Sequence, residues 1–176
     1  MSLESIASQL GQSTNKLPPV DKWDPPYCGA MDLVIKANGD WYYQGSIFKR
    51  HTLVKLLASV LKKEGEDYFL VTPVEKIKIQ VEDAPFILTN WQWQDEQQTM
   101  MQVCTNLDDC FILDDLHPLS IINNNYYVTV RRNLLAKVHR NVYYQWIDMA
   151  QEITTTKGTK LVITSAKQSF SLGYID

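Results

Sequence analysis

Alternation of apolar and polar residues predicts that much of this chain is β-strand. The clearest case is the segment FLVTPVEKIKIQV at residues 69–81, where every second residue after Lys76 is isoleucine or valine. Pro73 interrupts the alternation, and a proline cannot donate a hydrogen bond within a central ladder. We therefore predict two strands joined by a bend at Pro73, Val74 and Glu75. The strands are expected at residues 67–72 and 76–81.

Other β-rich stretches are separated by turn residues. Asn38-Gly39 lies between two of them and predicts a hairpin with a type I′ turn, which needs positive φ at both central residues. From Phe86 onward, strand-like runs alternate with short polar turns through residue 115, which is typical of a meander.

Three segments carry the spacing of amphipathic helices instead. Leu3, Ile6, Ala7 and Leu10 predict a short helix that Gly11 would end, followed by a proline-rich tether. A second helix is expected at residues 50–63, with Gly65 just beyond its end. A third is expected at residues 134–152, with Asn133 as its N-cap.

The order hairpin, helix, hairpin occurs twice along these predicted elements. In this comparison Arg50 falls on Arg131 and Lys76 falls on Lys167. A matching order over about 50 residues favours an internal duplication. The predicted fold class is α+β, with two similar small units packed together and a cleft at the seam between them. The expected divisions are a helix and tether at 1–24, a first unit at 25–90, and a meander plus second unit at 91–176.

Composition is that of an ordinary globular protein, with 45% hydrophobic and 21% charged residues. No apolar run approaches the ~20 residues of a membrane span, and the first residues lack the features of a secretory signal. Three cysteines fit a reducing compartment, so we expect a cytoplasmic protein. Cys104 and Cys110 could face each other across a hairpin, but a disulfide between them is not expected there.

Charge is unevenly distributed if the chain is cut at residue 116. Residues 1–116 hold 10 Lys/Arg and 17 Asp/Glu, and residues 117–176 hold 7 Lys/Arg and 3 Asp/Glu. The C-terminal part is therefore basic and the N-terminal part acidic. The basic part would either bind an anionic partner or dock on the acidic part, and the small excess favours docking.

Several motifs in the first unit resemble those of a bacterial protein family, the domain of unknown function 1285. They are Cys28-Gly29, Gly45-Ser46-Ile47, the run from Val71 to Lys76, and the run from Glu82 to Phe86. The resemblance implies a duplicated α+β core whose C-terminal unit is superficially like a pleckstrin-homology fold. It also implies a ligand site at the seam and a role in signal transduction, with no assigned activity.

The sequence therefore predicts a non-catalytic binding module for an anionic small molecule or a partner protein. Helix N-termini attract anions, and basic residues beside them strengthen that attraction. The expected ligand-binding residues are Trp41, Arg50, Thr72, Glu75, Lys76, Asp83, Arg131, Arg132 and Lys167. An equally open interpretation is that these charges form a salt-bridge network between the two units.

Two other classes of function are less favoured. An enzyme would use Glu75, Lys76 and Asp83 as acid/base groups, but no recognisable catalytic motif accompanies them. Nucleic-acid binding would need the basic part to present aromatic residues such as Tyr126, Tyr127 and Tyr143. No cofactor is expected, and the paired aspartates lack the spacing of a calcium loop.

Overall fold

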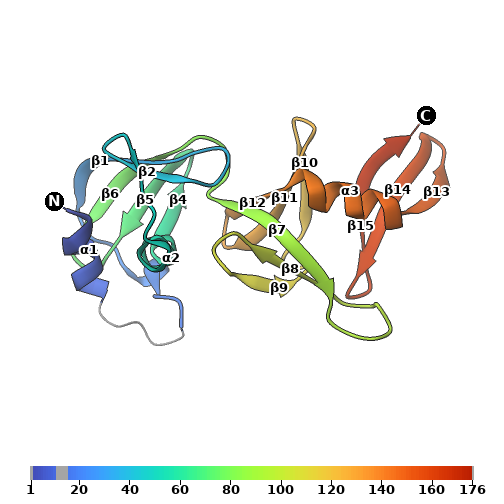
Figure 1. The fold of residues 1–176 in the computed structure, drawn as a ribbon, viewed down its shortest axis with the longest axis horizontal. Helices are drawn as coiled ribbons and strands as arrows, with labels where there is room; N and C mark the ends of the chain where they lie inside the picture. Colours follow the sequence, from blue (N-terminus) through green and yellow to red (C-terminus); the bar gives the residue numbers. More distant parts are fainter. Residues whose placement is uncertain (1, 11–15, 176) are drawn as a thin grey trace. The chain divides into compact units, whose positions relative to one another are not determined.

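The computed structural model describes residues 2–10 and 16–175 of the chain (Figure 1). The chain divides into two compact units, Met1–Asp83 and Ala84–Asp176. The division falls before the 90–91 boundary expected from the sequence. The reason is that the strand Phe86–Trp93 pairs along its length within the second unit.

Unit 1 contains one six-stranded sheet and two α-helices. Its elements are α1 (Leu3–Leu10), a 3-10 turn η1 (Val20–Lys22), β1 (Tyr27–Ile35), β2 (Trp41–Tyr43), β3 (Ser46–Ile47), α2 (His51–Ser59), β4 (Leu61–Glu64), β5 (Asp67–Val71) and β6 (Lys76–Val81). The strand order is β3-β2-β1-β6-β5-β4, and β1 and β6 run parallel. The strands at 67–71 and 76–81 confirm the predicted pair and its bend.

Unit 2 contains a second six-stranded sheet, one helix and a three-stranded sheet. Its elements are β7 (Phe86–Trp93), β8 (Met101–Thr105), β9 (Cys110–Ile112), β10 (Leu119–Ile122), β11 (Asn125–Arg131), β12 (Leu134–Val138), α3 (Arg140–Met149), β13 (Gln151–Thr155), β14 (Gly158–Ser165) and β15 (Gln168–Ile175). The sheets are ordered β10-β11-β12-β7-β8-β9 and β13-β14-β15.

The two six-stranded sheets share one topology. Each consists of two three-stranded meanders, and the first strand of one meander pairs in parallel with the last strand of the other: β1 with β6, and β7 with β12. The chain is thus an α+β protein with two similar sheet-rich units and a third, smaller sheet. Helix α2 joins the meanders in unit 1, whereas residues 113–118 make that connection in unit 2.

The residue-by-residue repeat expected from the sequence is therefore wrong, although the similarity of the units is confirmed. Lys76 begins β6, whose topological counterpart is β12, not the strand that follows Lys167. Arg50 precedes a helix, whereas Arg131 ends strand β11. Two alternating sequences of similar length can be aligned with each other in more than one way. The strand pairing shows that the correct alignment matches β6 with β12.

Two predicted helices are shorter than expected because part of each is a strand. α2 ends at Ser59, and Leu61–Glu64 forms β4, so Gly65 lies in the β4–β5 turn. Residues 134–138 form β12, in which buried and half-buried side chains alternate. The true N-cap of α3 is His139, whose Nδ1 accepts a hydrogen bond from the Asn141 amide at 3.2 Å.

The predicted hairpin at Asn38-Gly39 forms, but its turn is of a different type. Gly39 has a φ of 90° and donates from its N–H to the Lys36 carbonyl at 2.9 Å, while Asn38 is not among the residues with positive φ. A turn with positive φ at both central residues occurs instead at Gln44 (49°) and Gly45 (76°), between β2 and β3.

Each unit buries its own apolar core. In unit 1 the core includes Leu33, Leu70 and Ile77 of the sheet, and Leu57 of α2 and Ile6 of α1 are fully buried. In unit 2 the core includes Phe86, Leu88, Met101, Leu134 and Trp146. None of the helices in the described ranges has the length and apolar character that a membrane span requires.

Two expectations about chemistry change with the structure. Cys104 and Cys110 are joined in a disulfide, which the sequence did not lead us to expect, because they lie directly opposite each other on β8 and β9. The charge asymmetry also disappears at the true boundary. Residues 1–83 hold 10 Lys/Arg and 11 Asp/Glu, and residues 84–176 hold 7 and 9. Neither unit is basic.

Candidate functional site

The bend before β6 is held by its first residue, Thr72, which is 1% exposed. The Thr72 Oγ1 accepts hydrogen bonds from the backbone N–H groups of Val74 (3.3 Å) and Glu75 (3.1 Å). The Thr72 amide donates to the Glu75 carbonyl at 2.9 Å. The side chain of Thr72 therefore shapes the bend.

The two charged residues of the bend are engaged inside unit 1. Glu75 Oε1 accepts a hydrogen bond from Gln9 Nε2 of α1 at 3.0 Å. Lys76 Nζ lies 2.8 Å from Glu64 Oε2 and 4.9 Å from the centre of the Phe69 ring. Lys76 thus has an ion pair and a cation–π contact on the sheet face.

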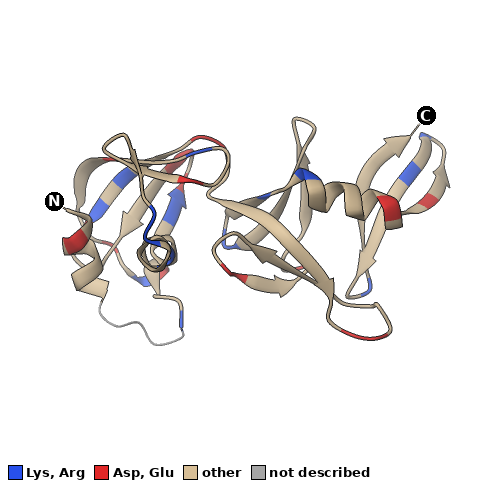
Figure 2. Cartoon of the chain, viewed as in Figure 1, with Lys and Arg blue, Asp and Glu red and all other residues tan. Residues whose placement is uncertain are grey.

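The same arrangement recurs across the charged face of this sheet, where Figure 2 shows Lys and Arg positions on β4 and β6. The pairs are Lys62–Glu64 (3.2 Å), Lys78–Asp67 (2.8 Å) and Lys36–Glu82 (2.7 Å). The hydrogen bond from Lys76 is the main reason that the pKa of Glu64 lies below its ordinary value. These lysines pair with carboxylates of their own unit, so their charges are balanced locally.

The proposed acid/base group is not assembled. Glu75 and Lys76 lie at the beginning of β6, and Asp83 lies beyond its other end. At about 3.3 Å per residue, seven residues of extended chain separate Lys76 from Asp83 by roughly 20 Å. Asp83 is half-buried and has interactions of its own.

Trp41 is a buried residue of the unit 1 core. It is 2% exposed and lies opposite Ile35 in the β1–β2 ladder, on the inner face of the sheet. Its position on that face, set by the hairpin register, was the feature that sequence reasoning missed.

In unit 2 the structure separates the three expected cations. Arg131 binds Asp109 at 3.0 Å and stacks over the Phe86 ring, next to the start of β7. Arg132 follows in the β11–β12 turn, with a φ of 53° and interactions of its own. Lys167 lies in the β14–β15 turn.

The β14–β15 turn, which carries Lys167, lies near the end of β7, whereas Arg131 lies near its start. The amide of Ala166 donates to the carbonyl of Thr99, in the loop that follows β7, at 2.8 Å. The eight residues of β7 therefore lie between the two arginines and Lys167. At about 3.3 Å per residue this is a separation of more than ~20 Å, so the three do not form one anion site.

The aromatic residues considered for nucleic-acid binding are also engaged internally. Tyr126 and Tyr143 stack at 4.4 Å, and the Tyr126 hydroxyl donates to the Leu172 carbonyl at 2.7 Å. Burial is the largest of the causes that raise the pKa of Tyr126 to about 12. Tyr127 is 8% exposed. Stacking on bases needs open aromatic faces, which these side chains do not offer.

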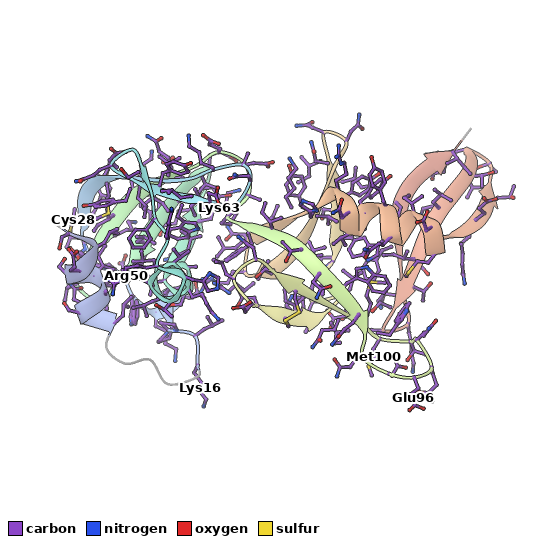
Figure 3. The ribbon with its side chains drawn as sticks, in the orientation of Figure 1. Lys16, Cys28, Arg50, Lys63, Glu96 and Met100 are labelled. Atoms are coloured by element: carbon purple, nitrogen blue, oxygen red, sulfur yellow. A yellow bond between two sulfur atoms is a disulfide. The ribbon has the colours of Figure 1, made fainter. Side chains whose placement is uncertain are left out.

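Arg50 differs from Lys76, the other predicted cation of unit 1. It is exposed and makes no ion pair with another residue of the described part of the chain. It is the N-cap residue of α2, where no side chain caps the helix, and its carbonyl accepts the Leu53 and Val54 amides. Figure 3 shows Arg50 beside α2, near α1.

Arg50 borders a groove between the two helices of unit 1. The groove has a volume of about 390 Å³ and is lined by Glu4 and Ala7 of α1 and by Arg50, Thr52, Leu53 and Leu56 of the α2 segment. We call these six residues the α1 groove. Its floor is apolar, and Arg50 and Glu4 provide a cation and a carboxylate among its lining residues.

Helix α1 is the part of this site that sequence reasoning placed outside the body. Leu3 (3% exposed) and Ile6 (0%) anchor α1 in unit 1, and Gln9 ties it to the bend. The helical spacing of Leu3, Ile6 and Ala7 was the available signal, because an amphipathic helix must bury its apolar face against another element. The predicted end of this helix at Gly11 lies outside the described residues.

No metal centre accompanies the groove. Among the described residues, no three His, Cys, Asp or Glu side chains are grouped so that they could hold a metal ion. The site thus offers one exposed guanidinium, an apolar floor and a helix N-terminus.

These features define an α+β protein made of twin sheet-rich units with a small groove in the first. The chain belongs to the DUF1285 family. Residues 18–84 match its N-terminal domain, described as a domain of unknown function, and residues 85–172 match its C-terminal domain, described as a protein of unknown function.

Two solved structures of family members are similar to this chain. A DUF1285 family protein from Silicibacter pomeroyi DSS-3 is 29% identical, with a TM-score of 0.84 over 99% of this chain and 96% of its own. Another from Shewanella baltica OS155 is 30% identical, with a TM-score of 0.58 over 67% of this chain and 91% of its own. No curated protein matches the chain.

Proposed function

We propose that this protein is a non-catalytic binding module that holds an amphipathic anion in the α1 groove. The ligand class is a small molecule with an apolar body and a carboxylate or phosphate group. The supporting observation is Arg50, an exposed cation beside an apolar groove whose guanidinium is not committed to a carboxylate of the described chain. The role in signal transduction implied by the family resemblance belongs to the same proposal.

The size and chemistry of the groove support a small molecule. About 390 Å³ lies within the range of ordinary ligand pockets, which are largely apolar with a few polar groups that fix orientation. Arg50 would hold the anionic group, and Ala7, Leu53 and Leu56 would contact the apolar body. The α2 N-terminus adds favourable electrostatics for negative charge near Arg50.

Binding is favoured over catalysis because the described unit assembles no acid/base set. Glu75 accepts from Gln9, Lys76 is paired with Glu64, and Asp83 lies beyond the far end of β6. A general acid or base needs to reach the same reacting group as its partner, and this arrangement does not offer that. The expectation that the ligand lies at a seam between the units stays a prediction.

A comparison of three simple probes tests the proposal. Octanoate carries both an apolar chain and a carboxylate, octanol carries only the chain, and acetate only the carboxylate. Thermal stability of the full chain should rise most with octanoate. A ligand at one hundred times its Kd stabilises the folded state by about 2.7 kcal/mol, which is readily measured.

Two variants with the same change of charge identify the site. Arg50→Ala should abolish the advantage of octanoate over octanol. Lys49→Ala, which removes the neighbouring exposed cation, should leave that advantage in place. Equal effects of octanoate and octanol on the wild-type protein, or equal losses in both variants, would refute an anion site at Arg50. Stabilisation by an acidic peptide but by none of the three probes would instead favour a partner protein.

A further inference from the structure

The disulfide of unit 2 lies on an accessible face of its sheet. Cys104 on β8 and Cys110 on β9 are directly opposite each other, and Cys110 is exposed while Cys104 is half-buried. Their neighbours in the ladder, Val103 and Met101, point to the other face and are fully buried. The disulfide therefore faces away from the core. It is drawn as a yellow bond in Figure 3.

The hairpin that carries this disulfide is held by other interactions. The Thr105 amide donates to the Asp109 carbonyl at 2.9 Å, and the Thr105 hydroxyl accepts from the amides of Leu107 (3.3 Å) and Asp109 (3.2 Å). Beyond the turn, the Leu113 amide donates to the Met101 carbonyl at 2.9 Å, which continues the β8–β9 ladder.

Two buried side chains anchor the same hairpin to the core. Leu107, in the turn, is 5% exposed, and Leu113, just after β9, is 0% exposed. The two cysteines are only six residues apart in sequence, so the loop that the disulfide closes is short. A short loop gains less from cross-linking than a long one, because its closure costs less entropy in the unfolded chain. The disulfide is thus an accessory to a hairpin that is already fixed at both ends.

We propose that Cys104–Cys110 is an exchangeable disulfide and a modification site for low-molecular-weight thiols such as glutathione. The attacking group is the thiolate of the small thiol, and the sulfur attacked is Sγ of Cys110, the more exposed of the two. This site is independent of the α1 groove, since it lies in the other unit.

The chemistry is an exchange in two steps. The external thiolate forms a bond to Sγ of Cys110 as the Cys104–Cys110 bond breaks, which leaves Cys104 as a thiolate that takes up a proton. A second external thiolate then attacks the sulfur of the small molecule in the mixed disulfide. That step releases the oxidised small-molecule disulfide and leaves both cysteines as thiols, so two electrons pass from two external thiols to the protein.

The test measures how the rate of reduction depends on thiol concentration in native buffer. A Cys28→Ser background leaves only the cysteine pair, because Cys28 is the remaining free cysteine. Samples are taken over time in reduced glutathione, alkylated, and analysed by mass spectrometry. Attack on the folded protein should give a rate that rises in proportion to glutathione concentration. A rate that reaches a plateau would mean that unit 2 must first open, and the proposal would be wrong.

A second measurement locates the attacked sulfur in matched single variants. In Cys104→Ser the remaining Cys110 should form a mixed disulfide with oxidised glutathione several times faster than Cys104 does in Cys110→Ser. Equal rates, or faster reaction of Cys104, would overturn the assignment of Cys110. Recovery of both residues as free thiols from protein kept under oxidising conditions would overturn the disulfide itself. Neither result would bear on ligand binding at Arg50.

Discussion

Replacing Lys76 by methionine tests whether this residue stabilises unit 1 or serves a ligand. Methionine keeps most of the apolar stem and removes the ammonium group, which lies 2.8 Å from Glu64 Oε2 and 4.9 Å from the Phe69 ring. The Lys76 side chain is 20% exposed and that of Glu64 is 38% exposed, so the pair is partly screened by water. We expect a loss of stability and no change in octanoate binding.

The size of the loss follows from the two contacts. A solvent-accessible ion pair contributes ~0.2–1 kcal/mol, and a cation–π contact near the surface contributes ~0.5–1 kcal/mol. Lys76→Met should therefore cost about 1–2 kcal/mol. Lys78→Met is the matched control, because Lys78 pairs with Asp67 at the same distance of 2.8 Å. This second pair is more exposed, with Lys78 at 41% and Asp67 at 50%. Lys78→Met should cost at most ~0.5 kcal/mol.

The loss should also depend on pH in a defined direction. The pKa of Glu64 is lowered from its ordinary value of 4.5, first by the hydrogen bond from Lys76. A carboxyl whose pKa is lower in the folded state stabilises the protein above its unfolded pKa, and that contribution is lost as pH falls through the folded pKa. The advantage of wild type over Lys76→Met should thus be complete at pH 7 and shrink below pH 4.5.

Native-state hydrogen exchange read by mass spectrometry is the suitable assay, because peptides from β4 to β6 report on unit 1 separately from unit 2. Equal protection in Lys76→Met and Lys78→Met at pH 7 would show that the Lys76–Glu64 pair contributes no more to stability than the more exposed Lys78–Asp67 pair. Unchanged stability together with lost octanoate binding would return Lys76 to the ligand site and contradict the structural role argued for it.

Two further substitutions test other contacts. Thr72→Val should destabilise unit 1 by about 1 kcal/mol, because it removes the hydroxyl that accepts hydrogen bonds from two amides of the bend. Hydrogen exchange of the bend should become faster in this variant. Thr52→Val, at an exposed position of α2, is the control and should leave that exchange unchanged. Tyr126→Phe should weaken the dependence of the free energy of unfolding on pH above about pH 10. The pKa of Tyr126 is raised to about 12, so folding favours the protonated phenol and wild-type stability falls as pH rises from about 10 towards 12. Chemical unfolding across that range would contradict this if both proteins lost stability equally.

Sequence periodicity predicted the strands well where one face is buried. Residues 76–81 alternate cleanly, and β6 forms there with Ile77 and Ile79 in the core. It failed at 134–138, because apolar residues there satisfy both a spacing of two and a spacing of three to four. Short apolar runs are ambiguous in this way, and pairing of β12 with β7 and β11 decides the outcome.

The candidate site was only half predictable for a related reason. Arg50 could be chosen because it precedes a local helical pattern, and the structure places it on the α1 groove. Its partner surface on α1 comes from more than 40 residues earlier, and no local pattern reports such a contact. Lys76 and Trp41 were chosen for their chemical type, but the pairing of strands turns one towards Glu64 and the other into the core.

The parallel pairing of first and last strands has a consequence for how the chain folds. In unit 1 it joins Tyr27 to Lys76, and in unit 2 it joins Phe86 to Ala136, so each closing contact spans about 50 residues. Domains dominated by such distant contacts fold slowly, on the order of milliseconds to seconds, because the loop must close before the contact forms. A nascent chain that has not yet supplied β12 exposes the unpaired edge of β7, and this interval is when the protein most needs protection from aggregation.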